Sequence, residues 1–361
     1  VYYQLIAFFN KTLILLFSIA FFILNFENLK IYYSYAWILG SLFVLLVYSF
    51  LIFKKFPFLL KRPKFEKKLY YDFIAYSSHL FTNSLSMKII TKIDLLMITF
   101  FLSVSNLAFY SNAIAIIDII VNVFTVTNKL ILPIFAEYYE KGKFNFLNTF
   151  LEVFYRVLIY FIMPLTLIFI LFPDDFLRLL FGREYIAGSY VFLLLSLFAI
   201  FKIILKYNLS FLNGIGKARE LHIPIIFVTM LNIILNYILI NTLGIEGAAI
   251  STSLSWFLLA LFSFILLKRS LSFKISYVIL LLTIFLSLFF LVFVILIKNN
   301  INIINIYVTV LLAILVNLIL YYVLGYLLKI YSLEDIYLFI PEGKARNFVE
   351  NIHKKCFPFL K

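Results

Sequence analysis

The sequence predicts an all-α fold, a polytopic membrane bundle of about ten transmembrane helices. Of the 361 residues, 65% are hydrophobic and only 13% are charged, which is too few charges to cover a water-soluble surface. The apolar residues gather in stretches of roughly 20 or more, the length that a helix needs to cross a bilayer. No segment alternates apolar and polar residues with turn signals about every ten positions, as a transmembrane barrel would require.

Ten stretches are long and apolar enough to be spans. They run over residues 4–25, 33–53, 72–102, 105–135, 149–172, 188–212, 221–241, 246–267, 275–297 and 304–327. The third and fourth are longer than a bilayer requires, which predicts a tilt or an amphipathic extension into water. The first is not typical of a signal peptide, because Lys11 lies inside the apolar run and no small-residue cleavage site follows Leu24.

The basic residues between the spans are distributed unevenly. One set of alternate segments, together with the tail at 328–361, holds 20 Lys and Arg residues. The opposite set holds only Lys30, Arg178, Arg183 and Lys298. Since basic residues accumulate on the cytoplasmic side, we expect a multi-pass protein of the cytoplasmic membrane with the 54–69 loop and the C-terminus inside. Topology and anionic lipid headgroups then explain the net charge of +14 without a nucleic-acid partner.

The sequence contains no recognisable catalytic, metal or nucleotide motif. Cys356 is the single cysteine, and the three histidines lie far apart, so neither a disulfide nor a metal site is expected. The run from Gly214 to Lys217 lacks the first half of a phosphate-binding loop and is typical of a helix end followed by a turn. We therefore expect a protein that is not an enzyme and has no cofactor.

Polar residues inside the spans are the candidates for binding a ligand. In the fourth span, Asp118, Asn122 and Lys129 recur at spacings that place them on one helix face. The full candidate set is Lys11, Lys88, Lys92, Asp94, Asp118, Asn122, Lys129 and Lys202. The excess of lysine over acidic residues favours an anionic ligand, such as a phosphate or a uronic acid.

Other interpretations of these polar residues stay open. Asp94 can pair with a neighbouring lysine and hold helices together. Lys206 and Arg156 can reach the cytoplasmic surface with their long side chains, and Glu152 lies one turn before Arg156 as an ion-pair partner.

Short patterns occur in a fixed order over residues 70–270. Lys92 and Asp94 precede an apolar run, and Ala108, Tyr110 and Ala113 follow it. Further patterns are Leu132-Pro133 with Phe135, Leu180-Phe181-Gly182 with Glu184-Tyr185, Leu212-Asn213-Gly214 with Gly216-Lys217, Asn232 with Asn236-Tyr237, and Gly244 to Ala249 before Ser251-Thr252. Together they resemble the polysaccharide flippases of the multidrug/oligosaccharidyl-lipid/polysaccharide exporter superfamily. Ala108 and Asn241 stand where that pattern usually has Gly and Pro, which bears on local backbone shape.

The resemblance implies a fold of two inward-facing bundles of about six helices, often followed by two extra helices. Residues 1–53 then correspond to the last two helices of the first bundle, 54–69 to a basic cytoplasmic loop and 70–267 to the second bundle. Residues 275–327 correspond to the extra pair and 328–361 to a cytoplasmic tail. This alignment lacks some four helices before Val1, so we expect a chain truncated at its N-terminus. We also expect a cavity that is open next to residues 4–53, and no transport by this chain alone.

The function that the resemblance implies is the flipping of lipid-linked oligosaccharide or polysaccharide repeat units by alternating access. The substrate would be a polyprenyl-pyrophosphate-linked oligosaccharide. Membrane lipids, a glycan polymerase and glycosyltransferases are the further candidate partners. The alternatives are a multidrug exporter or a peptidoglycan-precursor flippase of the same fold, or a membrane-embedded polysaccharide polymerase or ligase. An acidic cavity would favour the drug exporter, and an outer loop longer than 173–187 would favour the enzyme.

Overall fold

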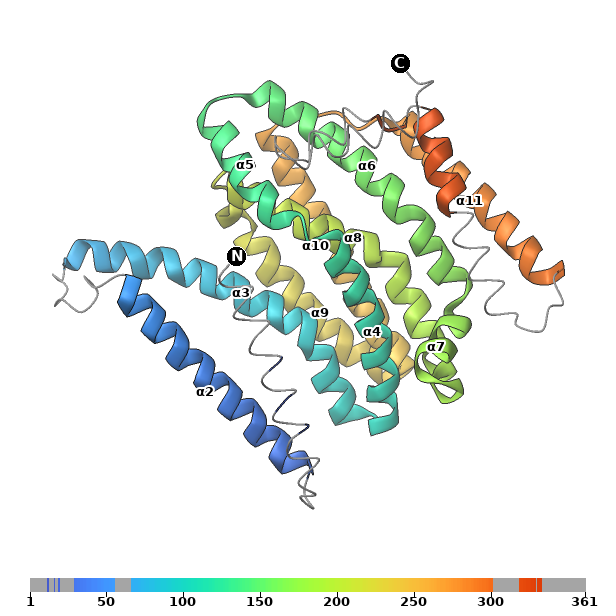
Figure 1. Ribbon diagram of the computed structural model, residues 1–361, viewed down its shortest axis with the longest axis horizontal. Coiled ribbons are helices and arrows are strands. Elements are labelled where there is room, and N and C mark those ends of the chain that lie inside the picture. Colours follow the sequence, from blue (N-terminus) through green and yellow to red (C-terminus); the bar gives the residue numbers. More distant parts are fainter. Residues whose placement is uncertain are drawn as a thin grey trace. The chain divides into compact units, whose positions relative to one another are not determined.

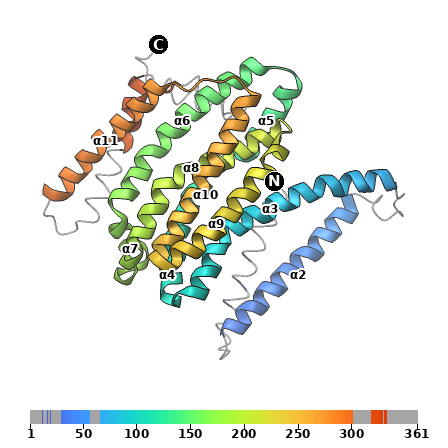
Figure 2. The same ribbon diagram turned by 180° about the vertical axis from the view of Figure 1, so that it is seen from behind.

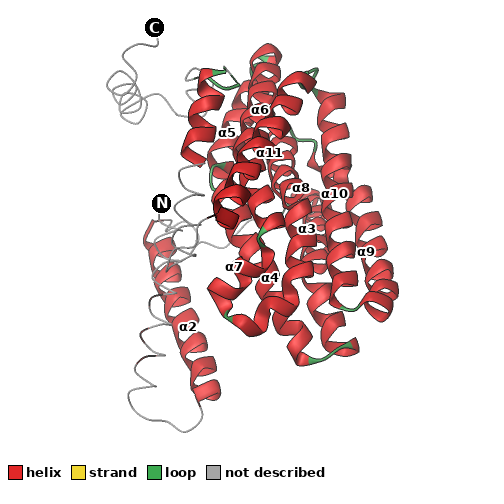
Figure 3. Cartoon of the chain, turned by 90° about the vertical axis from the view of Figure 1, so that its right-hand side faces the viewer, coloured by secondary structure: helices red, strands yellow, loops and turns green. Residues whose placement is uncertain are grey.

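The computed structural model describes residues 29–55, 66–300, 318–328 and 330–332, together with positions 12, 16 and 19. Within these residues the chain is helical and contains no strand (Figure 3). Six of the described helices are long and apolar enough to cross a membrane. The prediction of an all-α, polytopic membrane fold is therefore confirmed. The predicted spans at 4–25 and 304–327 lie largely outside the described residues.

The described chain divides into two compact units, Val1–Ala75 and Tyr76–Lys361. In the first unit, α2 runs over Leu29–Lys55 and covers the predicted span at 33–53. Its apolar side chains, including Trp37 and Phe50, are exposed. In the chain, α3 follows over Lys67–Phe101 and passes from the first unit into the second. Its polar residues explain why α3, predicted as the third span, is not among the six helices that are apolar enough to cross a membrane.

The second unit continues from α3 with a bundle of long helices (Figures 1 and 2). These are α4 (Val104–Phe124), α5 (Asn128–Glu140), α6 (Phe144–Leu171), α8 (Ser189–Gly214), α9 (His222–Leu243), α10 (Ile245–Ser270) and α11 (Tyr277–Asn300). A shorter helical segment covers residues 318–327. The central helix is α8, which packs against α4, α5, α6 and α10. Its buried side chains, such as Phe192, Ile203 and Phe211, form the middle of the hydrophobic core.

The predicted span at 105–135 is not one continuous helix. It is interrupted between Phe124, where α4 ends, and Asn128, where α5 begins. The Tyr207 hydroxyl of α8 donates a hydrogen bond to the backbone carbonyl of Phe124 and lies 2.6 Å from the Thr127 hydroxyl. Thr125 donates its own hydroxyl to the Val121 carbonyl. The Asn128 amide donates to Thr125 instead of Phe124, so the Tyr207 hydroxyl supplies the partner that the Phe124 carbonyl would have in a continuous helix. Residues 125–127 contain no Pro or Gly, and we infer that the neighbouring helix stabilises the break.

The segment at 173–187 is folded into two short helices. α7 covers Pro173–Phe181 and a 3₁₀-helix follows over Arg183–Gly188. Proline in the first turn, two aspartates beside it and Arg178 near the end are the residues that such a helix favours at these positions. Gly182 ends it with φ of 103°, a conformation that side chains other than glycine rarely adopt.

Two glycines permit close helix packing. A Cβ at Gly247 would lie 2.1 Å from the backbone oxygen of Leu239, where α9 and α10 approach each other. A Cβ at Gly214 would lie 2.9 Å from that of Phe135, where the end of α8 meets α5. Both belong to the patterns that carry the family resemblance, and the structure gives a steric reason for glycine at each position.

An aromatic cluster attaches the C-terminal helices to α6. The rings of Tyr160 and Tyr321 are stacked with their centroids 4.4 Å apart, and the Tyr160 hydroxyl donates to the Tyr321 carbonyl. On α11, Ser287 lies 3.0 Å from the Tyr321 hydroxyl. These contacts hold α11 and the 318–327 segment on the side of α6 that faces away from α4 (Figures 1 and 2).

Candidate functional site

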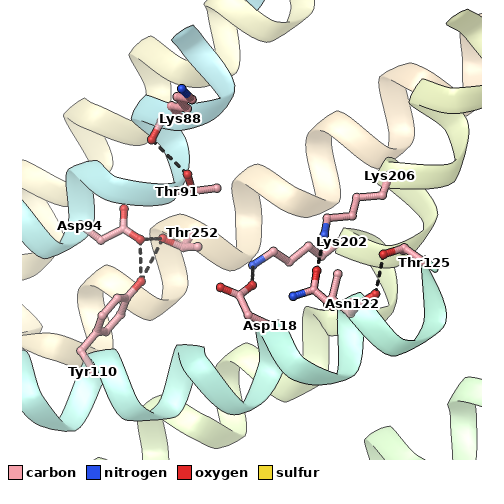
Figure 4. A network of polar contacts seen from close by, with 11 residues as sticks. Lys88, Thr91, Asp94, Tyr110, Asp118, Asn122, Thr125, Lys202, Lys206 and Thr252 are labelled. Atoms are coloured by element: carbon pink, nitrogen blue, oxygen red, sulfur yellow. Dashed lines mark hydrogen bonds and ion pairs between the residues drawn. The ribbon is translucent and has the colours of Figure 1, made fainter. Parts of the chain in front are cut away.

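Asp94 of α3 lies at the centre of a sealed polar network. Its side chain is fully buried. The hydroxyls of Tyr110 on α4 and Thr252 on α10 both lie 2.6 Å from Oδ2 of Asp94 and donate to it (Figure 4). The amide of Asn236 on α9 donates to Oδ1 over 3.2 Å. Four helices therefore meet at one carboxylate. We call Asp94 and the side chains that connect to it through hydrogen bonds the Asp94 network.

The Asp94 network continues along α9 and α10. Asn236 also donates to Asn232 over 3.2 Å, and Asn232 donates to the Ser255 hydroxyl over 3.0 Å. All of these side chains are buried. The carboxylate is therefore held by neutral groups, and the interpretation that Asp94 pairs with a lysine does not describe this structure. The same interpretation also says that Asp94 holds helices together, and these contacts agree with that.

The patterns behind the family resemblance converge on this network. Asp94 and Tyr110 belong to the first pattern, and Asn236 and Thr252 belong to two others, with Thr252 lying 158 residues from Asp94 in the sequence. In the fold they occupy a single site. The residues that carry the resemblance therefore join α3, α4, α9 and α10 through one set of hydrogen bonds.

A second polar cluster connects α4 with α8. The Lys202 ammonium donates to Oδ1 of Asp118 over 2.6 Å and lies 4.1 Å from the centroid of the Trp256 ring. The Lys202 side chain is only 9% exposed, whereas that of Asp118 is 51% exposed. A buried ammonium is costly unless it is paired, and here a carboxylate and the face of an indole ring compensate it.

One helical turn further on, the same two helices form a second contact. The Lys206 ammonium donates to Oδ1 of Asn122 over 3.1 Å (Figure 4). Asp118 and Asn122 lie four residues apart on α4, as Lys202 and Lys206 do on α8. Because residues four apart share a helix face, the two contacts lie one helical turn from each other. We call these four residues, together with Trp256, the Lys202 site. Unlike the Asp94 network, it combines cations with a half-exposed carboxylate and an exposed amide.

The structure brings together only some of the predicted site residues. Asp118, Asn122 and Lys202 lie in one cluster, while Asp94 lies in the sealed network. Lys88 and Lys92 are exposed on α3. Lys11 and the side chain of Lys129 lie outside the described part of the chain. The role of all eight residues in binding a substrate stays a prediction.

Two residues of the Lys202 site were missing from the predicted set. For Lys206 the sequence indicates a side chain that can reach the membrane surface, whereas in the structure its ammonium contacts Asn122. Trp256 gave no signal of its own, although it lies one turn after Thr252 on α10. Over the described ranges, no group of three His, Cys, Asp or Glu residues is arranged to hold a metal ion.

The fold and these sites define a multi-pass membrane protein whose spans enclose polar residues. Residues 6–189 match the family model described as polysaccharide biosynthesis protein. This match covers half of the chain, so the chain belongs to that family. The predicted resemblance to polysaccharide flippases of the exporter superfamily is thereby confirmed.

Two curated relatives extend this result. An uncharacterized membrane protein of Methanocaldococcus jannaschii is 25% identical over 240 residues, covering 65% of this chain and 47% of the relative. The probable low-salt glycan biosynthesis flippase Agl15 of Haloferax volcanii is 26% identical over 200 residues, covering 55% and 41%. The chain thus spans less than half the length of these curated relatives.

Among solved structures, the lipid II flippase MurJ in an inward closed conformation superimposes with a TM-score of 0.67. The superposition covers 88% of this chain and 66% of that one, at 18% sequence identity. The likeness therefore establishes a shared fold.

Proposed function

We propose that the chain acts in the flipping of lipid-linked oligosaccharide or polysaccharide repeat units across the cytoplasmic membrane. Its family, the relatives named as flippases and the fold support this proposal. The proposed mechanism is alternating access between two helix bundles around a shared polar site. The protein itself performs no covalent chemistry, and the energy comes from an ion gradient, the membrane potential or the gradient of the substrate.

The observation that carries the proposal is the position of Lys202. Its ammonium is buried but lies next to Asp118, whose side chain is half exposed. An arriving anion can compete with Asp118 for that ammonium, and Lys206 lies one turn away to share the added negative charge. Two neighbouring cations suit a pyrophosphate, whose oxygens accept several charge-assisted hydrogen bonds.

The proposed substrate is a polyprenyl-pyrophosphate-linked oligosaccharide. Its pyrophosphate would bind at the Lys202 site, while the polyprenyl tail stays in the bilayer. Lys11, Lys88, Lys92 and Lys129 are proposed as further cations along the path of the substrate. Glycosyltransferases that build the repeat unit and a polymerase that extends it are the proposed partner enzymes.

Binding by the purified chain tests this proposal. We expect the chain to bind a polyprenyl-pyrophosphate oligosaccharide, and Lys202→Met to weaken that binding at least tenfold. The matched control is Lys217→Met, which changes a lysine in the turn after α8, outside the Lys202 site. Equal binding by the chain and by Lys202→Met would contradict the role of Lys202. Tighter binding of a cationic drug than of the oligosaccharide would favour the multidrug exporter, and tighter binding of a peptidoglycan precursor would favour that flippase class.

Complementation tests transport itself. A strain that lacks its oligosaccharide flippase would receive the complete gene product to which this chain belongs, either unchanged or with Lys202→Met. We expect rescue by the unchanged protein and weaker rescue by the variant. Failure of the unchanged protein, when it reaches the membrane and binds the oligosaccharide, would contradict a transport function.

The orientation is also a proposal, with the C-terminus in the cytoplasm. Single cysteines introduced with Cys356→Ser allow it to be measured. Glu184→Cys should react with an impermeant reagent added from outside, whereas Lys143→Cys should react only after the membrane is opened. Both positions are exposed. Phe176 in the same outer segment is a poorer labelling position, because its ring packs 4.7 Å from that of Phe169. The reverse labelling pattern would overturn the orientation.

A further inference from the structure

A second polar site lies away from the Lys202 site, between α6 and the beginning of α11. Here a cavity of about 340 Å³ is enclosed by both helices and by the linker that joins α10 to α11. Its polar lining includes Glu152 and Arg156 of α6, Lys274 and Ser276 of the linker, and Thr283 of α11. We propose that this cavity binds the phosphate group of a membrane phospholipid.

The linker is fixed by core packing, so the cavity is already formed in the structure. Phe273 is only 2% exposed, and its ring stacks on Tyr155 of α6 with the centroids 5.5 Å apart. It also meets the edge of Phe264 on α10 at 5.7 Å. Next to it, the backbone amide of Lys274 donates to the Glu152 carboxylate over 2.7 Å. The backbone of Lys274 is therefore held beside the cavity, and this contact does not use the ammonium group.

The charges of the lining match a phosphate diester. Among the lining residues that the structure describes, Arg156 and Lys274 are cationic, and Glu152 is the one carboxylate and accepts the Lys274 amide. Guanidinium and ammonium groups are the usual donors to phosphate oxygens, so these two side chains suit the negative charge of a phosphodiester. The hydroxyl of Ser276 adds a neutral donor.

The position of the cavity fits a lipid headgroup. Glu152 lies eight residues into α6, roughly 12 Å along the helix from Phe144 at the rise of an α-helix. The adjoining ends carry Lys141, Lys143, Lys268 and Arg269, the side that the charge distribution predicts to be cytoplasmic. Apolar residues, including Ile159 and Leu280, complete the lining, where acyl chains would continue. Basic pockets between spanning helices on the cytoplasmic side are typical sites for phospholipid headgroups.

Native mass spectrometry of the full chain in detergent tests this proposal. The probes are phosphatidylglycerol, diacylglycerol with the same acyl chains, and inorganic phosphate. We expect phosphatidylglycerol to bind at least tenfold more tightly than diacylglycerol, which lacks the phosphate. Lys274→Gln should reduce phosphatidylglycerol binding about tenfold, and the double variant Arg156→Gln/Lys274→Gln should reduce it further.

The control is the double variant Lys268→Gln/Arg269→Gln. It removes two exposed cations from the end of α10, on the same predicted side but outside the cavity lining. We expect it to bind phosphatidylglycerol within about twofold of the unchanged chain. Because Lys274 is exposed, its single substitution keeps the test valid if the Arg156 variant fails to fold.

Unchanged binding by Lys274→Gln would overturn the proposal. So would equal losses in the Lys274 and the Lys268/Arg269 variants, or equal binding of diacylglycerol and phosphatidylglycerol. Inorganic phosphate distinguishes the two sources of the ligand. Displacement of phosphatidylglycerol by millimolar phosphate in the unchanged chain would favour free phosphate as the occupant and contradict a lipid site.

Discussion

Asp94 and Asp118 lie in consecutive helices of the same bundle but in opposite environments. Asp94 is fully buried and is held by neutral donors from three other helices. Asp118 is half exposed and has one cationic partner, Lys202. The hydrogen-bonding capacity of the first carboxylate is committed to the fold, whereas the second retains capacity for a ligand. The comparison teaches that a carboxylate within a spanning helix does not by itself identify a binding residue.

The lysines differ in the same way. Lys202 is buried between Asp118 and Trp256, while Lys88 and Lys92 are exposed on α3. A buried ammonium needs compensation from its surroundings, so its neighbours are fixed by the fold. An exposed lysine has no such requirement. Of these three lysines, Lys202 is therefore the one whose neighbours are fixed by the fold.

The largest effect is expected from Asp94→Ala. This change removes the acceptor that Tyr110, Thr252 and Asn236 share. Each unsatisfied buried donor costs about 1–3 kcal/mol, and Tyr110 and Asn236 each keep one other partner, so we expect the free energy of unfolding to fall by about 3–5 kcal/mol. Denaturant unfolding of the purified chain measures it. The control is the double variant Asp118→Ala/Lys202→Met, which removes the half-exposed carboxylate without leaving the buried ammonium unpaired. An equal loss in Asp94→Ala and in this control would erase the distinction between the two carboxylates.

A smaller change in stability but a clear loss of binding is expected from Lys202→Met. Methionine fills similar space without a charge, and Asp118 can be solvated, so the free energy of unfolding should change by no more than about 1 kcal/mol. Binding of the lipid-linked oligosaccharide should weaken at least tenfold, which corresponds to about 1.4 kcal/mol. A loss of stability as large as that of Asp94→Ala would show that Lys202 has a structural role instead.

The contact between Lys202 and Trp256 should have a moderate effect. Trp256→Phe keeps an aromatic ring with a weaker attraction for the ammonium. In a double-mutant cycle with Lys202→Met, we expect a coupling energy of about 0.5–1.5 kcal/mol in unfolding. Additive effects of the two substitutions would mean that the indole ring contributes packing alone.

The smallest effect is expected from Asn122→Ala. Its amide is exposed, so the free energy of unfolding should change by less than about 0.5 kcal/mol, and oligosaccharide binding should weaken only twofold to threefold. Asn236→Ala is the matched comparison, because it removes a buried amide that serves both Asp94 and Asn232. We expect it to cost about 1–3 kcal/mol of stability. Similar unfolding curves for the two asparagine variants would contradict the division into sealed and open clusters.

The sequence by itself determined the helical membrane fold and the helix face on which some of the polar residues lie. Spans are recognised from about 20 consecutive apolar residues, because transfer into lipid depends on the composition of each segment. The spacing of Asp118 and Asn122 placed them correctly on one face, since helical periodicity is a local property. The start and end of α7 are likewise marked by local residues, with Pro173 in its first turn and Gly182 after its last.

Only the tertiary structure decided which polar residues are sealed and which are open. Periodicity gives the face of a helix on which Asp94 or Asp118 lies, but it does not give the neighbour that covers that face. Thr252 reaches Asp94 from 158 positions away, and Tyr207 interrupts a predicted span from another helix. Trp256 covers Lys202 only because α10 packs against α8. Burial depends on the packing of distant segments, so no pattern within one span can predict it.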